Sequence, residues 1–150
     1  MQLPVERASS AGAGALETLR AHARLLARED GLVLDPVNKT VAVLFPERLA
    51  EPVLPLADLY ATQVRELAGD FSAPPECAAL IDGAGGIDAV DAFLRLHLDE
   101  RWPLAEALAA IPDAAGRRAL RDRFDAGWWW RRRAGVVPKL GMRTLGIDLR

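Results

Sequence analysis

The chain has few of the residues on which covalent cross-links and metal sites depend. It holds one cysteine, Cys77, and two histidines, His22 and His97, among 150 residues. A single cysteine cannot form an internal disulfide, and this suits a reducing cytosol. The sequence also lacks His-x-x-x-His, Glu-x-x-His and paired-cysteine spacings, which are the usual marks of zinc and di-iron sites. We therefore expect no metal and no other cofactor.

Long apolar runs are missing as well. No stretch approaches the roughly 20 apolar residues that a transmembrane helix needs, and the first residues carry charge where a signal peptide would be apolar. Hydrophobic residues make up 51% of the chain and charged residues 27%, which is typical of a folded domain and not of a disordered one. We expect a single globular domain over residues 1–150, located in the cytoplasm.

Apolar residues recur at helical spacing along most of the chain. This periodicity predicts five or six helices, at about residues 13–29, 56–68, 72–82, 87–99, 103–111 and 114–126. Asp113 is the expected N-cap of the last helix. The glycines at 83, 85 and 86 superficially resemble a dinucleotide-binding turn, but Asp88 occupies the position of its third glycine. We interpret this segment as a connection between two helices.

One segment favours strands over helices. Residues 32–35 and 40–45 are rich in β-prone side chains and flank a turn at Pro36–Lys39. They predict an antiparallel hairpin, about 32–45, in which Val41, Val43 and Phe45 face a helix. The apolar residues after Gly135 add the expectation of a short C-terminal strand. The predicted fold class is therefore α+β and helix-dominated.

The candidates for chemistry are sparse. His97 falls near the centre of the apolar stripe of the 87–99 helix, so we expect it to be mostly buried on the inward face. Cys77 is interpreted as a small core residue. The acidic pairs of the same helix region are interpreted as solvated helix faces, not as an acid/base pair: Asp88 with Asp91, and Asp99 with Glu100.

The end of the chain differs in charge from the rest. Residues 117–150 include ten basic and three acidic side chains, a net charge of +7, whereas residues 1–116 have a net charge of −9. This basic region contains three consecutive tryptophans and three arginines, Trp128, Trp129, Trp130, Arg131, Arg132 and Arg133. Three adjacent indoles cannot all point inward, because on a helix they fan over about 200°. Trp and Arg are enriched at interaction hot spots, so these six residues are the candidate partner-binding surface.

The function expected from these features is binding without catalysis. The leading hypothesis is an accessory protein of a bacterial multiprotein system, such as an adaptor, assembly factor or chaperone, that contacts an acidic protein partner. A nucleic-acid-binding regulator that uses residues 117–150 is the alternative. A small enzyme with a site around His97 is a second alternative, and a membrane-surface partner is the least favoured.

Overall fold

The computed structural model describes residues 34, 37–48, 53–69 and 73–127. The chain divides into two compact units, Met1–Val33 and Leu34–Arg150, and every described residue belongs to the second. The predicted helix at 13–29, the predicted C-terminal strand and the six candidate residues Trp128–Arg133 lie outside the described residues.

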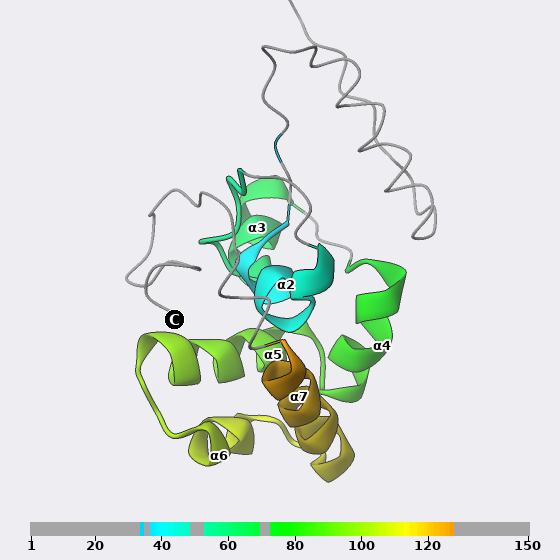
Figure 1. Cartoon of the computed structure of the whole chain (residues 1–150), viewed down its shortest axis with the longest axis vertical. Coiled ribbons are helices and arrows are strands. Elements are labelled where there is room, and N and C mark those ends of the chain that lie inside the picture. The colour runs from blue at the N-terminus through cyan, green and yellow to red at the C-terminus, as the bar shows by residue number, and fades with distance from the viewer. Residues whose placement is uncertain (1–33, 35–36, 49–52, 70–72, 128–150) are drawn as a thin grey trace, which may run out of the picture. The chain divides into compact units, whose positions relative to one another are not determined.

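The described part of the second unit is built from helices (Figure 1). In chain order these are α2 (Lys39–Leu44), η1 (Pro46–Arg48), α3 (Ala61–Ala68), α4 (Pro75–Gly83), α5 (Ile87–Leu94), η2 (Arg95–Asp99), α6 (Leu104–Ala107), η3 (Leu108–Ala110) and α7 (Ala114–Ala126). The η1 and η3 segments are 3₁₀ turns, and η2 is a π-helical turn. None of the described helices has the length and apolar composition that crossing a lipid bilayer requires.

The predicted hairpin at 32–45 is wrong, because residues 39–44 form the helix α2. Asn38 begins it: its side chain accepts a hydrogen bond from the Val41 N–H at 3.0 Å, which is the usual role of an N-cap. All six residues of α2 are buried, so both alternating sets of side chains pack, and not only Val41 and Val43. A helix that is surrounded on every side carries an unbroken apolar run, and such a run cannot be told from a buried strand by its period alone.

Within the described residues the only β pairing is an isolated parallel bridge between Leu34 and Val53. The described fold is therefore helical, and the α+β expectation is corrected on this point. Figure 1 shows α2 in the middle of the described helices, and α2 contacts α3, α5 and α7. Its central position explains why Val43 and Ala42 are inaccessible to solvent.

The remaining helices follow the sequence more closely. Gly85 and Gly86 have φ angles of 93° and 92° and make the turn between α4 and α5, as the helix-connection interpretation predicted. The single helix predicted at 87–99 instead changes from α to π geometry after Leu94. Asp113 caps α7 by accepting a hydrogen bond from the Gly116 N–H at 2.8 Å, so this prediction is confirmed.

Candidate functional site

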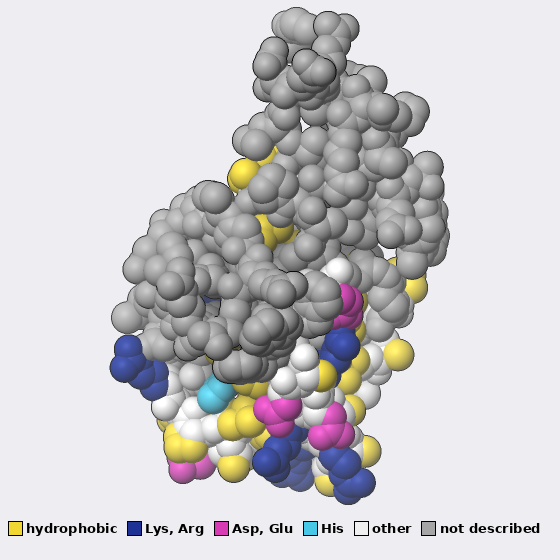
Figure 2. Space-filling view, in the orientation of Figure 1, with side chains coloured by type: hydrophobic (Ala, Val, Ile, Leu, Met, Phe, Trp, Pro, Cys, Tyr) yellow, Lys and Arg dark blue, Asp and Glu magenta, His cyan; other side chains and the backbone are white. Residues whose placement is uncertain are grey.

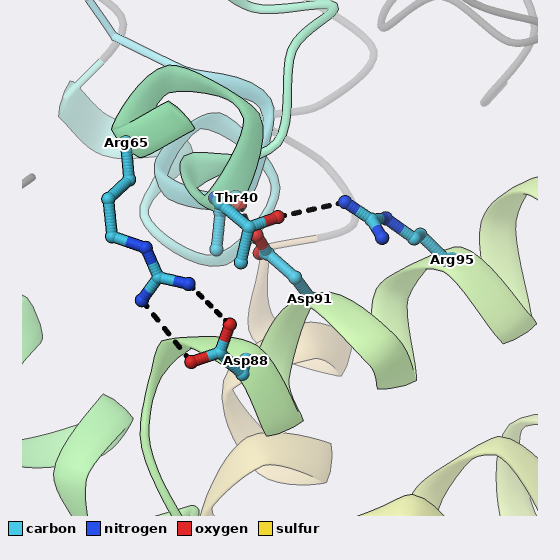
Figure 3. A network of polar contacts seen from close by, with 6 residues as sticks. Thr40, Arg65, Asp88, Asp91 and Arg95 are labelled. Atoms are coloured by element: carbon cyan, nitrogen blue, oxygen red, sulfur yellow. Dashed lines mark hydrogen bonds and ion pairs between the residues drawn. The ribbon is translucent and has the colours of Figure 1, made fainter. Parts of the chain in front are cut away.

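A buried carboxylate joins three helices. Asp91 on α5 is 1% exposed. It accepts a hydrogen bond from the Thr40 hydroxyl at 2.5 Å and another from the backbone N–H of Thr62 at 2.7 Å. The Thr40 hydroxyl oxygen in turn accepts from the Ala61 N–H at 2.9 Å. The first turn of α2, the first turn of α3 and the middle of α5 therefore meet at this one side chain (Figure 3).

A second carboxylate lies at the C-terminal end of the π-helical turn. Asp99 accepts from the Lys39 ammonium at 3.1 Å and from the Tyr60 hydroxyl at 2.8 Å, one donor on each carboxylate oxygen. The Lys39 side chain is 1% exposed and that of Asp99 is 24% exposed, so water reaches the pair from the Asp99 side. Burial, with the nearby Asp99 carboxylate as the next cause, raises the pKa of Tyr60. The phenol therefore stays protonated and donates.

Arg95 connects the two carboxylate centres. Its guanidinium donates to the Thr62 hydroxyl at 2.8 Å and lies 5.1 Å from the centre of the Tyr60 ring, on which Lys39 also stacks at 4.6 Å. Arg95 itself is exposed. We define the polar cluster as Lys39, Thr40, Tyr60, Thr62, Asp91, Arg95 and Asp99. It combines a buried ammonium, a neutral phenol, two carboxylates and one guanidinium that faces solvent.

Local structure explains how these residues come together. Lys39 and Thr40 are the first two residues of the Asn38-capped α2. Tyr60 is the N-cap of α3, and its N–H donates to the Gln63 side chain at 2.8 Å. The π-helical turn is a geometry that recurs at functional sites, and both Arg95 and Asp99 are on it. Buried ionisable groups with specific charge partners are likewise a feature of functional sites.

An exposed ion pair lies beside the cluster. The Arg65 guanidinium on α3 donates two hydrogen bonds to Asp88 on α5, at 2.6 and 3.2 Å (Figure 3). The hydrogen bond from Arg65 lowers the pKa of Asp88, and the same bond raises the pKa of Arg65. Because both side chains are exposed, this pair is a surface link between α3 and α5.

The residues singled out from the sequence have mixed outcomes. Cys77 is buried, as predicted. Asp88 and Glu100 are exposed as predicted, but Asp91 is buried and Asp99 is partly buried, so their interpretation as solvated faces is wrong. The physical reason is that α2 and the start of α3 cover that side of α5, and local periodicity does not reveal which other segment covers a face.

His97 has a packing role. Its ring contacts Phe124 at 5.1 Å and Phe93 at 6.4 Å between centroids, as an inward-facing position predicts, although the residue is only partly buried. Its Nδ1 donates to the Trp102 carbonyl at 2.8 Å. No contact of His97 with the polar cluster is seen among the described residues, so the cluster and not His97 is the candidate site.

The described part of the basic region is not uniformly positive. On α7, Arg121 pairs with Asp125 at 3.9 Å, and Arg123 pairs with Glu47. Figure 2 shows Lys or Arg and Asp or Glu side chains intermixed at the lower end of the molecule, where Figure 1 draws α7. An open groove of about 550 Å³ runs between Phe45, Leu80 and this helix. The groove shares no residue with the polar cluster.

The described side chains do not form a cluster of metal ligands. Among them, no three His, Cys, Asp or Glu come together as a bound metal ion would require. The two carboxylates of the cluster are each engaged by protein donors, Asp91 by Thr40 and Asp99 by Lys39. The cluster is therefore a network of hydrogen bonds and ion pairs.

Comparison with known proteins points to an enzyme class. The curated proteins that resemble this chain carry the name NH₃-dependent NAD⁺ synthetase. The protein from Chlorobaculum parvum is 33% identical over 147 residues, which is 83% of this chain and 50% of that protein. The protein from Chlorobaculum tepidum is 32% identical over 142 residues, with the same coverage. The protein from Chlorobium phaeobacteroides strain BS1 is 28% identical over 171 residues, covering 95% of this chain and 59% of that protein.

The chain thus spans about half the length of the curated relatives it matches. No protein-family model matches it, and no solved structure is significantly similar. The similarity to enzymes corrects the expectation of a non-enzymatic accessory protein, including the adaptor and chaperone hypotheses. Sequence reasoning missed this because it looked for catalytic motifs within short stretches, whereas the polar cluster is assembled from residues up to 60 positions apart.

The location of the match matters for the site. A matched stretch that covers 83% of 150 residues includes positions 38 to 99, whichever end of the chain it omits. Every residue of the polar cluster falls between these positions. The similarity to the synthetases therefore extends over the whole candidate site.

Proposed function

We propose that this chain is an enzyme, or a part of one, that takes part in the NH₃-dependent formation of NAD⁺. The observation that carries the proposal is the similarity to NH₃-dependent NAD⁺ synthetases across the stretch that contains the polar cluster. The cluster adds a physical reason, because a buried ammonium and two buried or partly buried carboxylates are costly to remove from water, and such groups gather at functional sites.

The chemistry of the product defines the substrates to test. Ammonia can supply the carboxamide nitrogen of NAD⁺, so the acceptor would be the carboxylic-acid analogue of NAD⁺. A carboxylate does not react with ammonia unless one of its oxygens is first made a leaving group, for which a nucleoside triphosphate is the common source. All three reactants carry charge or hydrogen-bond donors, and two of them carry phosphates.

Within the described residues, Arg95 is the member of the cluster best placed to meet a phosphate. Its guanidinium is held by the Thr62 hydroxyl and by the face of the Tyr60 ring, while the residue remains exposed. A guanidinium has five N–H donors, so it can keep the Thr62 bond and still donate two parallel bonds to a phosphate. Lys39, Tyr60 and Asp99 would position this edge of the site without touching the ligand.

The test measures NAD⁺ produced by the purified chain from ammonium, the carboxylic-acid dinucleotide and Mg-ATP, with NAD⁺ detected by its enzymatic reduction. We expect product only when all three reactants are present. Arg95→Gln should lower the rate at least tenfold. Arg118→Gln, which removes an exposed arginine on α7, is the matched control and should leave the rate unchanged. If the chain forms no NAD⁺ from these three reactants, the proposal is wrong.

Binding of a protein partner by the C-terminal basic region does not depend on this activity. We also propose that Trp128–Arg133 contacts an acidic protein surface, on the strength of the +7 charge of residues 117–150. Replacing Arg131, Arg132 and Arg133 together by alanine should weaken the binding of a co-purifying acidic partner. The melting temperature of the chain should stay nearly unchanged. Selective binding of nucleic acid by these arginines would contradict this choice of partner. We keep the cytoplasm as the proposed location.

A further inference from the structure

The loop that follows the π-helical turn carries two side chains that the polar cluster does not use. Trp102 is 45% exposed, and Arg101 beside it is also exposed. Arg101 has a φ of 63°, and it is the only described non-glycine residue whose φ is positive. An L-residue adopts this left-handed conformation at an energetic cost, and it persists only where the surrounding structure holds it.

Three hydrogen bonds hold this loop. The Trp102 N–H donates to the Leu96 carbonyl at 2.9 Å, and the Glu100 N–H donates to the Arg95 carbonyl at 3.0 Å. His97 donates to the Trp102 carbonyl at 2.8 Å. The His97 ring is itself packed between core phenylalanines, so the indole is presented from a fixed backbone. A side chain that extends from an ordered backbone has less conformational freedom to lose when it binds a ligand.

The charges around the indole select a ligand. The face of a tryptophan attracts cations more strongly than that of any other aromatic residue. The exposed Glu100 lies two positions before it in the chain, and its negative charge favours a positively charged ring over a neutral or anionic one. Arg101 provides the opposite charge, and its planar guanidinium suits a phosphate. A ligand that joins a cationic ring to a phosphate matches this pair of side chains.

We propose that Arg101 and Trp102 bind the pyridinium nucleotide half of a dinucleotide, with the pyridinium ring on the indole and the adjacent phosphate on the guanidinium. The proposal rests on the proposed function, because the named relatives make NAD⁺, whose nicotinamide ring is a cation. It assigns to this chain a binding position in the loop directly after η2, the π-helical turn that begins with the exposed Arg95.

The experiment is equilibrium binding of nicotinamide mononucleotide to the full chain by calorimetry, without ammonium or ATP. The comparison ligands are its reduced form, whose ring is neutral, and AMP, which has no pyridinium ring. We expect the oxidised mononucleotide to bind about fivefold or more tightly than either, in line with the usual strength of stacking on one aromatic side chain. Trp102→Ala should abolish this preference, and Trp102→Tyr should keep part of it.

Two further variants sharpen the test. Arg101→Gln should weaken the mononucleotide about fivefold or more while leaving nicotinamide riboside, which lacks the phosphate, unaffected. Leu67→Ala removes another exposed apolar side chain, 77% exposed on α3, and should change no affinity. Melting curves of every variant show whether the fold is intact, and Trp102→Leu replaces Trp102→Ala if the latter melts early.

The outcomes separate the two proposals. If the oxidised mononucleotide does not bind, or binds equally to wild type and Trp102→Ala, the loop assignment is overturned, even if the chain still forms NAD⁺. If it binds through Trp102 but the chain forms no NAD⁺ from ammonium, the loop assignment stands and the proposed function is wrong.

Discussion

Removal of the Asp91 carboxylate tests whether the polar cluster holds the helices together. Asp91→Ala leaves the Thr40 hydroxyl and the Thr62 N–H without their acceptor in an environment that is closed to water. Hydrogen bonds to a charged group contribute about 1.5–3 kcal/mol each. Two such bonds predict a loss of about 3–6 kcal/mol in the free energy of unfolding.

Urea unfolding followed by circular dichroism measures this loss. With a denaturant dependence of about 2 kcal/mol per molar, a loss of that size lowers the midpoint by about 1.5–3 M. Asp91→Asn keeps one carbonyl oxygen as an acceptor, so it should fall between wild type and alanine. This second variant also gives a measurable transition if the alanine protein is largely unfolded.

Asp88→Ala is the matched control, because it removes a carboxylate from the same helix three positions earlier. Its side chain is 73% exposed and pairs with Arg65 at the surface, so we expect no measurable change in the midpoint at neutral pH. The Arg65 hydrogen bond holds the pKa of Asp88 below its usual range. Whatever the pair contributes is therefore present above the usual pKa of an aspartate and lost as the pH falls through the lowered pKa of Asp88. Equal midpoints for Asp91→Ala and Asp88→Ala would refute the role given to Asp91.

The parts of the fold that the sequence predicted correctly depend on local signals. Asp113 followed by an amphipathic segment specifies the start of α7 whatever packs on it, and paired glycines at 85 and 86 specify a turn through their positive φ angles. The prediction of a helix at 87–99 has the correct position, but the structure has α geometry only up to Leu94 and π geometry after it. The apolar periodicity of the sequence contains no signal for the change to π form after Leu94.

The helix α2 shows where local signals fail. Its residues Val41 and Val43 are β-branched, and the preceding Pro36 and Asn38 are typical of a turn between strands. Asn38 is equally good as an N-cap, and the choice between the two roles is made by burial on all sides of residues 39–44. No alternation in the sequence records that burial.

The candidate site was hidden for the same reason, although one signal was available. On a helical projection of 87–99, Asp91 lies at the edge of the apolar stripe, about 20° from Leu98, so the period did not require a solvated position. Its partners could not be found this way, since Thr40 is 51 positions distant and belongs to the segment that was assigned to a strand. The proposed class of enzyme rests on similarity to curated proteins and not on a motif within the chain.

Four further substitutions test how the helices are joined. Asp113→Ala should cost about 1 kcal/mol in a urea titration, because it removes the side-chain cap of α7. Asp99→Ala should destabilise the fold more than Lys39→Met, because the first leaves a buried ammonium without this carboxylate, whereas the second leaves a carboxylate that water reaches. Gly116→Ala should lose about 1–3 kcal/mol by overpacking, since an added Cβ would lie 2.3 Å from the backbone carbonyl oxygen of Gly83, and a backbone atom cannot rotate away as a side chain can. Alanine otherwise favours a helix over glycine by about 1 kcal/mol. A Gly116→Ala protein more stable than wild type would therefore show that α4 and α7 do not approach as closely as the structure has them.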